Sequence, residues 1–163
     1  MTMRRTGWAA LSATSLLLAT AGCTSDSSAA TAPTASPIPG PCRSEITRDA
    51  LPVWARAGFS DDGSGVPHVF SEHGDLLAVL FRYPPASSAD PQDGTKILWV
   101  SRLPQEPMQP LVIEATLDGT TTTLTREVPG GPGPSSIQLP TAGCWRLALS
   151  WSGHQDRMML QFS

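Results

Sequence analysis

The chain has 163 residues, of which 40% are hydrophobic, enough for one domain of ordinary size with a packed core. Only 15% are charged, the formal net charge is −3, and Lys96 is the single lysine. A weakly acidic chain without a basic cluster gains nothing from counterion release on DNA or RNA, so we do not expect a nucleic-acid partner.

The N-terminus has the pattern of an export signal. Arg4 and Arg5 precede a short apolar run, residues 8–21 (WAALSATSLLLATA), which ends in small residues immediately before Cys23. A basic start, a short apolar stretch and a small-residue cleavage site are typical of a secretory signal peptide. The run is shorter than the roughly 20 apolar residues of a transmembrane helix and is interrupted by serine and threonine.

The cysteine at this boundary changes the interpretation. The stretch LATAGC resembles a bacterial lipobox, in which diacylglycerol is attached to the cysteine thiol and signal peptidase II cleaves before it. Thr20 stands where that family usually has leucine. The resemblance implies a signal peptide over residues 1–22, a lipid-modified Cys23 and an exported protein held at the outer face of the cell membrane. The alternative is ordinary secretion with a free Cys23.

Residues 24–41 (TSDSSAATAPTASPIPGP) read as a disordered tether. They are almost all Ser, Thr, Ala and Pro, with one charge and one large apolar residue, Ile38. Such a segment cannot bury enough surface to offset the entropy of ordering it. Its prolines favour extended conformations, in which 18 residues reach roughly 55 Å. We therefore expect three parts: the signal peptide over residues 1–22, lipidated Cys23 with the tether over residues 23–41, and a folded domain over residues 42–163.

From Cys42 onward, short apolar runs alternate with Pro/Gly clusters, and none of the runs keeps a helical period. Asp118-Gly119 is a strong hairpin signal, and Ser152–Asp156 is predicted to be a second hairpin loop. The proline-rich run 129–134 can be neither a helix nor a central strand. The expected strands are Val53–Phe59, Asp75–Tyr83, Thr95–Ser101, Leu111–Leu117, Thr121–Val128, Ser135–Leu139, Cys144–Trp151 and Arg157–Phe162.

This pattern predicts an all-β fold, an antiparallel β-sandwich of about seven to nine strands. Because side chains alternate along a strand, each run assigns its residues to faces. Trp145 and Trp151 fall on the apolar face of their strand, and Trp99 also has core neighbours, while Trp54 is the tryptophan expected to be exposed. Residues 75–83 and 97–100 are apolar on both faces, which suits central strands covered on two sides.

The nearest common architecture is immunoglobulin-like, but two marks of true immunoglobulin domains are absent from the sequence. Ala142 occupies the position of the tyrosine corner, two residues before Cys144. Cys144 itself falls on the polar face of its strand, with Arg146 and Ser150, so a disulfide through the core is not expected.

With Cys23 assigned to lipid, Cys42 and Cys144 remain in an oxidising compartment. An even remainder outside the cell predicts a disulfide between them. The alternative is two buried free thiols. Because Cys144 faces outward, the predicted bond lies on the outer surface of its sheet, and it pins the start of the domain to a strand near its end.

The strongest candidate for ligand chemistry is the segment PHVFSEHGD, which carries His68, Glu72, His73 and Asp75. Two imidazoles and two carboxylates within eight residues could bind zinc or copper, but Pro67 and Gly74 favour an exposed polar loop. The motifs of serine hydrolases and of phosphate-binding loops do not occur, and scattered acids such as Asp61 and Asp62 read as turn residues. The sequence therefore predicts no catalytic residue and no cofactor.

Residues 131–151 (GPGPSSIQLPTAGCWRLALSW), the lipobox and residues 96–101 (KILWVS) together resemble a group of uncharacterised lipoproteins of high-GC Gram-positive bacteria. The resemblance implies an envelope lipoprotein with a β-sandwich and brings no activity with it. We therefore expect a monomeric, non-enzymatic binding or structural domain whose partners are the membrane, through the lipid, and another envelope protein or polymer. The alternative is a small-ligand or metal-binding lipoprotein that uses the loop from His68 to Asp75.

Overall fold

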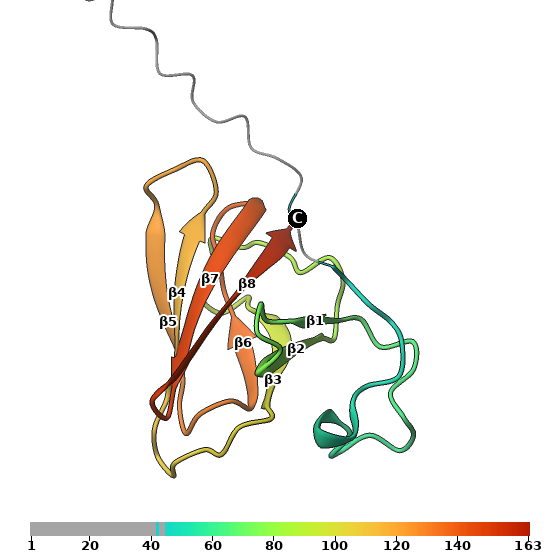
Figure 1. The fold of residues 1–163 in the computed structure, drawn as a ribbon. Helices are drawn as coiled ribbons and strands as arrows, with labels where there is room; N and C mark the ends of the chain where they lie inside the picture. Colours follow the sequence, from blue (N-terminus) through green and yellow to red (C-terminus); the bar gives the residue numbers. More distant parts are fainter. Residues whose placement is uncertain (1–41, 43–44) are drawn as a thin grey trace, which may run out of the picture. The chain divides into compact units, whose positions relative to one another are not determined.

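The computed structural model describes Cys42 and residues 45–163; the predicted signal peptide, Cys23 and the tether to Pro41 lie outside the described residues. The described chain forms eight antiparallel strands and one short 3-10 helix (Figure 1). The elements are η1 (Val53–Ala55), β1 (His68–Phe70), β2 (Leu76–Leu80), β3 (Thr95–Ser101), β4 (Leu111–Leu117), β5 (Thr123–Val128), β6 (Pro134–Ile137), β7 (Gly143–Trp151) and β8 (His154–Phe162).

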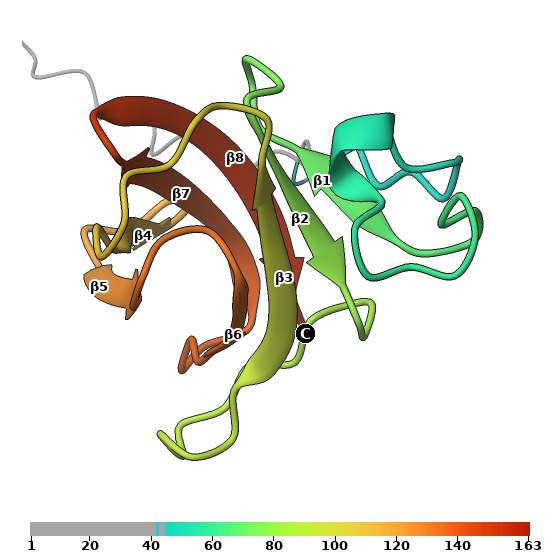
Figure 2. The same cartoon turned by 90° about the horizontal axis from the view of Figure 1, so that it is seen from below.

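The strands form two four-stranded sheets, with the orders β1-β2-β3-β6 and β5-β4-β7-β8. The chain passes from the first sheet to the second after β3, returns after β5 and crosses again after β6. Figure 2 shows the two sheets facing each other, with the η1 segment on the outer side of β1 and β2. The predicted β-sandwich is confirmed, and its strand number lies within the predicted range; the immunoglobulin-like relationship stays a prediction.

The three tryptophans assigned to the core by strand parity are buried between the sheets. Trp99 is 1% exposed, Trp145 0% and Trp151 2%. Each indole N–H is satisfied: Trp99 donates to Ser135 Oγ and Trp151 to Ser101 Oγ, both at 3.0 Å, and Trp145 donates to a backbone carbonyl at 2.9 Å. A large buried ring with a paired N–H contributes apolar area without the cost of an unsatisfied donor.

The prediction that two central strands are covered on both faces is confirmed. β2 and β3 are the inner strands of their sheet, and all five residues of β2 are buried. Leu76, Ala78 and Leu80 pack in the main core, whereas Leu77 and Val79 pack in a second cluster under residues 51–66. Continuous apolar runs belong to strands without a solvent face.

The segment that provides this outer cover is not the strand predicted over Val53–Phe59. Pro52 precedes the 3-10 turn, and the Ala55 N–H donates to its carbonyl at 2.8 Å. Gly58 has a φ of +90°, a conformation incompatible with a continuing strand. Val53 is 79% exposed, and Trp54, expected to be exposed, is partly buried in the second cluster. The predicted strand was wrong because residue propensities alone do not distinguish a short turn with apolar residues from a strand.

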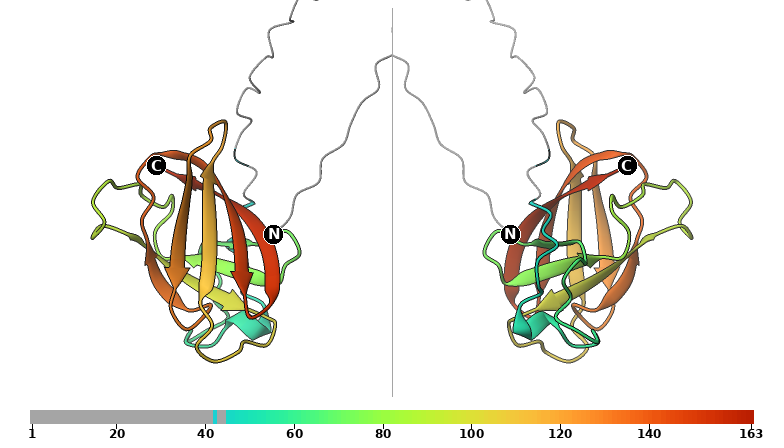
Figure 3. Two further views of the ribbon diagram at one scale, coloured as in Figure 1. Left: turned by 90° about the vertical axis from the view of Figure 1, so that its left-hand side faces the viewer. Right: turned by 90° about the vertical axis from the view of Figure 1, so that its right-hand side faces the viewer.

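The strand predicted over Asp75–Tyr83 ends three residues earlier, at Leu80. Its last expected residues leave the sheet, and Phe81 and Tyr83 are 59% and 42% exposed. Two prolines follow directly, and proline has no N–H to donate to a strand ladder, so pairing cannot continue through them. The loop between β2 and β3 stands out from the side of the sandwich (Figure 3).

The Asp118-Gly119 hairpin is confirmed between β4 and β5, but the second predicted hairpin loop is tighter than expected. Only Ser152 and Gly153 separate β7 from β8, with φ of 46° and 77°, as in a two-residue turn of type I′. Residues 154–156 therefore belong to β8. The proline-rich run ends at Pro134, the first residue of β6, which lies at a sheet edge where proline is tolerated.

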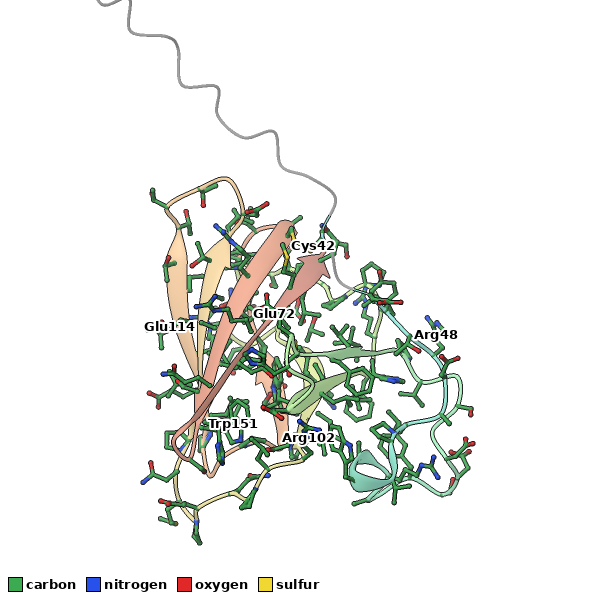
Figure 4. All side chains as sticks on the ribbon, viewed as in Figure 1. Cys42, Arg48, Glu72, Arg102, Glu114 and Trp151 are labelled. Atoms are coloured by element: carbon green, nitrogen blue, oxygen red, sulfur yellow. A yellow bond between two sulfur atoms is a disulfide. The ribbon has the colours of Figure 1, made fainter. Side chains whose placement is uncertain are left out.

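Cys42 and Cys144 form the predicted disulfide, with a Cα–Cα distance of 5.3 Å. Along β7, Trp145, Leu147 and Leu149 are buried, while Arg146 and Ala148 are exposed, so Cys144 faces away from the core, as parity predicts. The bond therefore lies on the outer face of the β5-β4-β7-β8 sheet. Cys42 and Trp151, which ends β7, mark opposite ends of this sheet in Figure 4.

Candidate functional site

Three of the four predicted ligand residues, Glu72, His73 and Asp75, lie in the turn between β1 and β2, and this turn meets β8 of the opposite sheet. Three of its backbone N–H groups point at β8. The N–H of Glu72 donates to the Arg157 carbonyl at 2.7 Å, that of His73 to Asp156 Oδ1 at 3.1 Å, and that of Asp75 to Asp156 Oδ2 at 3.3 Å. The turn therefore covers part of the open edge of β8.

Asp156 is the centre of this junction, and it is 3% exposed. Besides the two N–H groups of the turn, it accepts the hydroxyl of Ser71 at 2.5 Å and the N–H of Arg157 at 2.7 Å. The Ser71 oxygen accepts the Leu76 N–H at 3.0 Å, which fixes the hydroxyl at the base of the hairpin. Among the described residues, every buried side-chain nitrogen or oxygen has a partner. A buried carboxylate is tolerated when its oxygens are satisfied in this way.

Two opposing effects set the ionisation of Asp156. Burial is the largest and raises its pKa, but the hydrogen bonds from Ser71 and from the N–H groups of Arg157, His73 and Asp75 favour the charged form. Together they hold the pKa below its ordinary value of 3.8. The carboxylate is therefore ionised at neutral pH and binds the turn as an anion.

His73 contributes its ring as well as its backbone. The Nδ1 atom lies 3.2 Å from Asp156 Oδ1, while the side chain is 70% exposed. A carboxylate beside an imidazole provides two of the three groups of a nucleophilic triad, which also needs a hydroxyl or thiol on the other ring nitrogen. Ser71 is directed at Asp156 instead. The contacts between His73 and Asp156 therefore orient an exposed imidazole and hold the β1–β2 turn against β8.

Asp75 is bound to a different partner. Its Oδ1 atom receives Arg102 through Nη2 at 2.6 Å and Nε at 2.7 Å, and the Arg102 backbone N–H donates to the Asp75 carbonyl at 3.1 Å. Arg102 directly follows β3, so this ion pair joins the β1–β2 turn to the crossover between the sheets.

The structure does not bring the four predicted ligands together. His68 lies in β1 and is 1% exposed, with Nδ1 2.9 Å from the Val66 carbonyl and its ring against Phe70; the expectation of an exposed loop position was wrong. The short run His-Val-Phe pairs with β2, which buries the imidazole.

Among the described residues, one group could offer converging metal ligands, with atoms within 4.8 Å of one another: His73, Asp75 and Asp156. Glu72 is outside it. A carboxylate has about four lone-pair positions, and Asp156 already accepts four hydrogen bonds. A cation here would have to displace bonds that hold the turn in place.

Two open grooves flank the junction beside β8. One, of about 500 Å³, is lined by polar groups that include Glu72, His73, Glu114 and Arg157. Glu72 and Glu114 are labelled in Figure 4. A neighbouring groove of about 590 Å³ includes Glu72 together with Phe70 and other apolar side chains. The polar groove carries both signs of charge, whereas the charged groups of the second groove are both acidic, Glu45 and Glu72.

Asp156 is the residue that the sequence interpretation missed, because it was assigned to a hairpin loop. A signal was present: Asp156 has the same parity as Met158, Leu160 and Phe162, which were placed in the core. A carboxylate in phase with three core residues indicates a buried, hydrogen-bonded acid once the strand is extended back to His154.

No family model, curated protein or solved structure matches the chain. In the part of the chain that the structure describes, no helix is long and apolar enough to cross a membrane.

Proposed function

We propose that this protein is a lipid-anchored extracytoplasmic lipoprotein whose β-sandwich is a non-enzymatic binding or structural accessory domain of the cell envelope. The observation that carries the proposal is the pairing of cysteines. Cys42 and Cys144 are joined to each other, which leaves Cys23, in the stretch LATAGC, as the third cysteine of the chain. Disulfides persist in oxidising compartments, which fits an exported domain.

The geometry of the domain supports an accessory function. The His73–Asp156 contact and the Asp75–Arg102 pair connect the turn to neighbouring elements, and the Ser71 hydroxyl is directed at a carboxylate. These groups stabilise the junction of the two sheets. A broad hydrolase and transferase screen that found turnover, abolished by a single point substitution, would overturn the non-enzymatic function.

The anchor is tested by labelling cells with radioactive palmitate. We expect label on the wild-type chain and none on Cys23→Ala. The double variant Cys42→Ser/Cys144→Ser is the matched control, because it removes cysteines but keeps the lipobox, and it should retain the label. Unlabelled wild-type protein, or label that persists on Cys23→Ala, would contradict the anchor.

The second candidate function, metal binding on the predicted loop, is supported by the proximity of His73, Asp75 and Asp156. Calorimetric titration with zinc and with copper tests it. Binding tighter than high micromolar that is lost in His73→Ala would favour it. Binding that is unchanged in His68→Ala/His73→Ala would remove it.

A further inference from the structure

Two exposed aromatic residues lie at the start of the loop between β2 and β3. Phe81 and Tyr83 are two of five large hydrophobic side chains with substantial exposure among the described residues. Arg82, between them in sequence, is exposed as well. Neither the main core nor the second cluster includes these rings. Their apolar faces are therefore available to a ligand.

The part of the loop that follows the rings is held in place by hydrogen bonds. The Thr95 hydroxyl accepts the Ala86 N–H at 2.9 Å and donates to the Ala86 carbonyl at 3.0 Å. The N–H groups of the next two residues donate to the carbonyls of Ser163, at 2.8 Å, and Leu139, at 2.9 Å. Four bonds to three different parts of the domain fix the position of the segment. A fixed platform loses little entropy when a ligand binds.

Phe81 borders an open hollow of about 430 Å³ between the ends of β3 and β6. The hollow is also lined by Lys96, Pro134 and two serines, Ser135 and Ser136. Lys96 is exposed and makes no ion pair or side-chain hydrogen bond with any described residue. The site thus combines an apolar floor, hydroxyl groups and one unpaired ammonium.

The hydroxyl groups of Ser135 and Ser136 differ in whether a hydrogen bond holds them in place. Ser135 Oγ accepts the Trp99 indole N–H at 3.0 Å and is fixed by it. Ser136 pairs with Lys96 across the two strands, so both side chains point to the same face of the sheet. The Ser136 hydroxyl makes no hydrogen bond with any residue in the described part of the chain. The Ser136 hydroxyl, which can donate or accept a hydrogen bond, and the Lys96 ammonium therefore lie side by side in the hollow that Phe81 borders.

We propose that this hollow binds an acidic glycan, with Phe81 packing against the apolar face of a sugar ring and Lys96 pairing with a carboxylate on it. The proposal rests on the proposed function as an envelope-binding domain and names the ligand class. A pyranose presents C–H groups on one face and hydroxyls at its rim, which matches the Phe81 ring and the Ser136 hydroxyl in one hollow. An exposed ammonium next to an apolar surface selects an anionic sugar over a neutral one.

The dimensions and charge of the site favour this ligand over a macromolecular surface. A volume of about 430 Å³ lies within the roughly 300–1,000 Å³ range of small-ligand sites. A bare polyanion needs several cations in a row for affinity, whereas the hollow has one, Lys96, and the chain has a net charge of −3. The Phe81 ring must therefore provide much of the binding energy.

The test measures binding of the purified full chain to three probes by calorimetry and affinity electrophoresis: oligogalacturonate as an acidic glycan, dextran as a neutral one, and inorganic polyphosphate as a bare anion. We expect oligogalacturonate to bind and the other two to bind at least about tenfold more weakly. Phe81→Ala and Lys96→Gln should each weaken oligogalacturonate binding by about tenfold, and Lys96→Arg by less, because it keeps the charge.

Two control variants match the tested substitutions at distant exposed positions. Met108→Ala removes an apolar side chain that is 89% exposed, and Arg157→Gln removes an exposed cation on β8; both should bind like the wild type. Absence of oligogalacturonate binding, equal binding of dextran or polyphosphate, or unchanged binding in Phe81→Ala would each overturn the proposal. Palmitate label on Cys23 is measured on the same protein, so a failed glycan site is distinguishable from a failed anchor.

Discussion

Replacing Asp156 by asparagine tests the junction of the two sheets. The amide keeps one oxygen but presents an NH₂ group to donors that now face a carboxylate oxygen. Of the four hydrogen bonds that Asp156 accepts, the two on one oxygen are lost. A hydrogen bond to a charged group contributes about 1.5–3 kcal/mol, and partial relaxation of the turn reduces the sum. We therefore expect a loss of about 2–4 kcal/mol in the free energy of unfolding.

The assay is urea unfolding followed by tryptophan fluorescence, combined with hydrogen exchange. Exchange of the amides of Glu72, His73 and Asp75 should accelerate more than exchange in β3, because the turn loses its partners first. The matched control is Asp118→Asn, which removes a half-buried acid 3.5 Å from the exposed Arg146 and should cost less than about 1 kcal/mol. A loss at Asp156 no larger than in this control would refute the structural reasoning.

The pH dependence of the unfolding free energy provides a second test of the Asp156→Asn variant. The pKa of Asp156 in the folded protein lies below its ordinary value of 3.8. Its contribution to stability is therefore complete above about pH 4 and is lost as the pH falls through the lower folded value. The difference in unfolding free energy between wild type and Asp156→Asn should be constant at neutral pH and should shrink under acid conditions. A difference that grows on acidification would contradict the assigned direction.

Three further perturbations follow from local geometry. Removing the disulfide with Cys42→Ser/Cys144→Ser should cost about 2–5 kcal/mol and leave a β-rich circular dichroism spectrum, whereas two reactive thiols in the untreated exported protein would refute the bond. Met108 has a φ of 67° at the exposed tip of a turn, so Met108→Gly should raise the thermal midpoint while Met108→Ala does not. Gly63 has a φ of +75°, and an added Cβ would lie 2.5 Å from Leu51 Cδ1, so Gly63→Ala should lower the urea midpoint markedly.

Strand parity predicted those parts of the fold that depend on burial. Trp145 and Trp151 face the core, Cys144 faces outward, and β2 is buried on both faces, because alternation along a strand is a property of the covalent chain. The segment from Val53 could not be predicted in this way. Its apolar residues lie in a turn that packs against the outer face of β2. The local sequence does not show which surface a turn will pack against.

The candidate site was only partly predictable, for a related reason. His73 and Asp75 were identified by residue type, but their partners Asp156 and Arg102 lie 83 and 27 residues away in the sequence. Pairings over such distances are set by how the sheets pack. Phe81 likewise read as the end of a strand, and its exposure depends on where pairing with β3 stops.

The disulfide also determines where mechanical load enters the domain. Force along the proposed tether reaches Cys144 on β7, which is hydrogen-bonded to β4 on one side and β8 on the other. Pulling Cys144 against a partner bound at the opposite end of this sheet loads many of these hydrogen bonds in parallel, in shear. After reduction, the force would instead reach residue 45 and then the isolated bridge between Thr47 and His68, and it would peel the 51–66 segment from β2 one contact at a time. The oxidised domain should therefore unfold at a distinctly higher force than the reduced one.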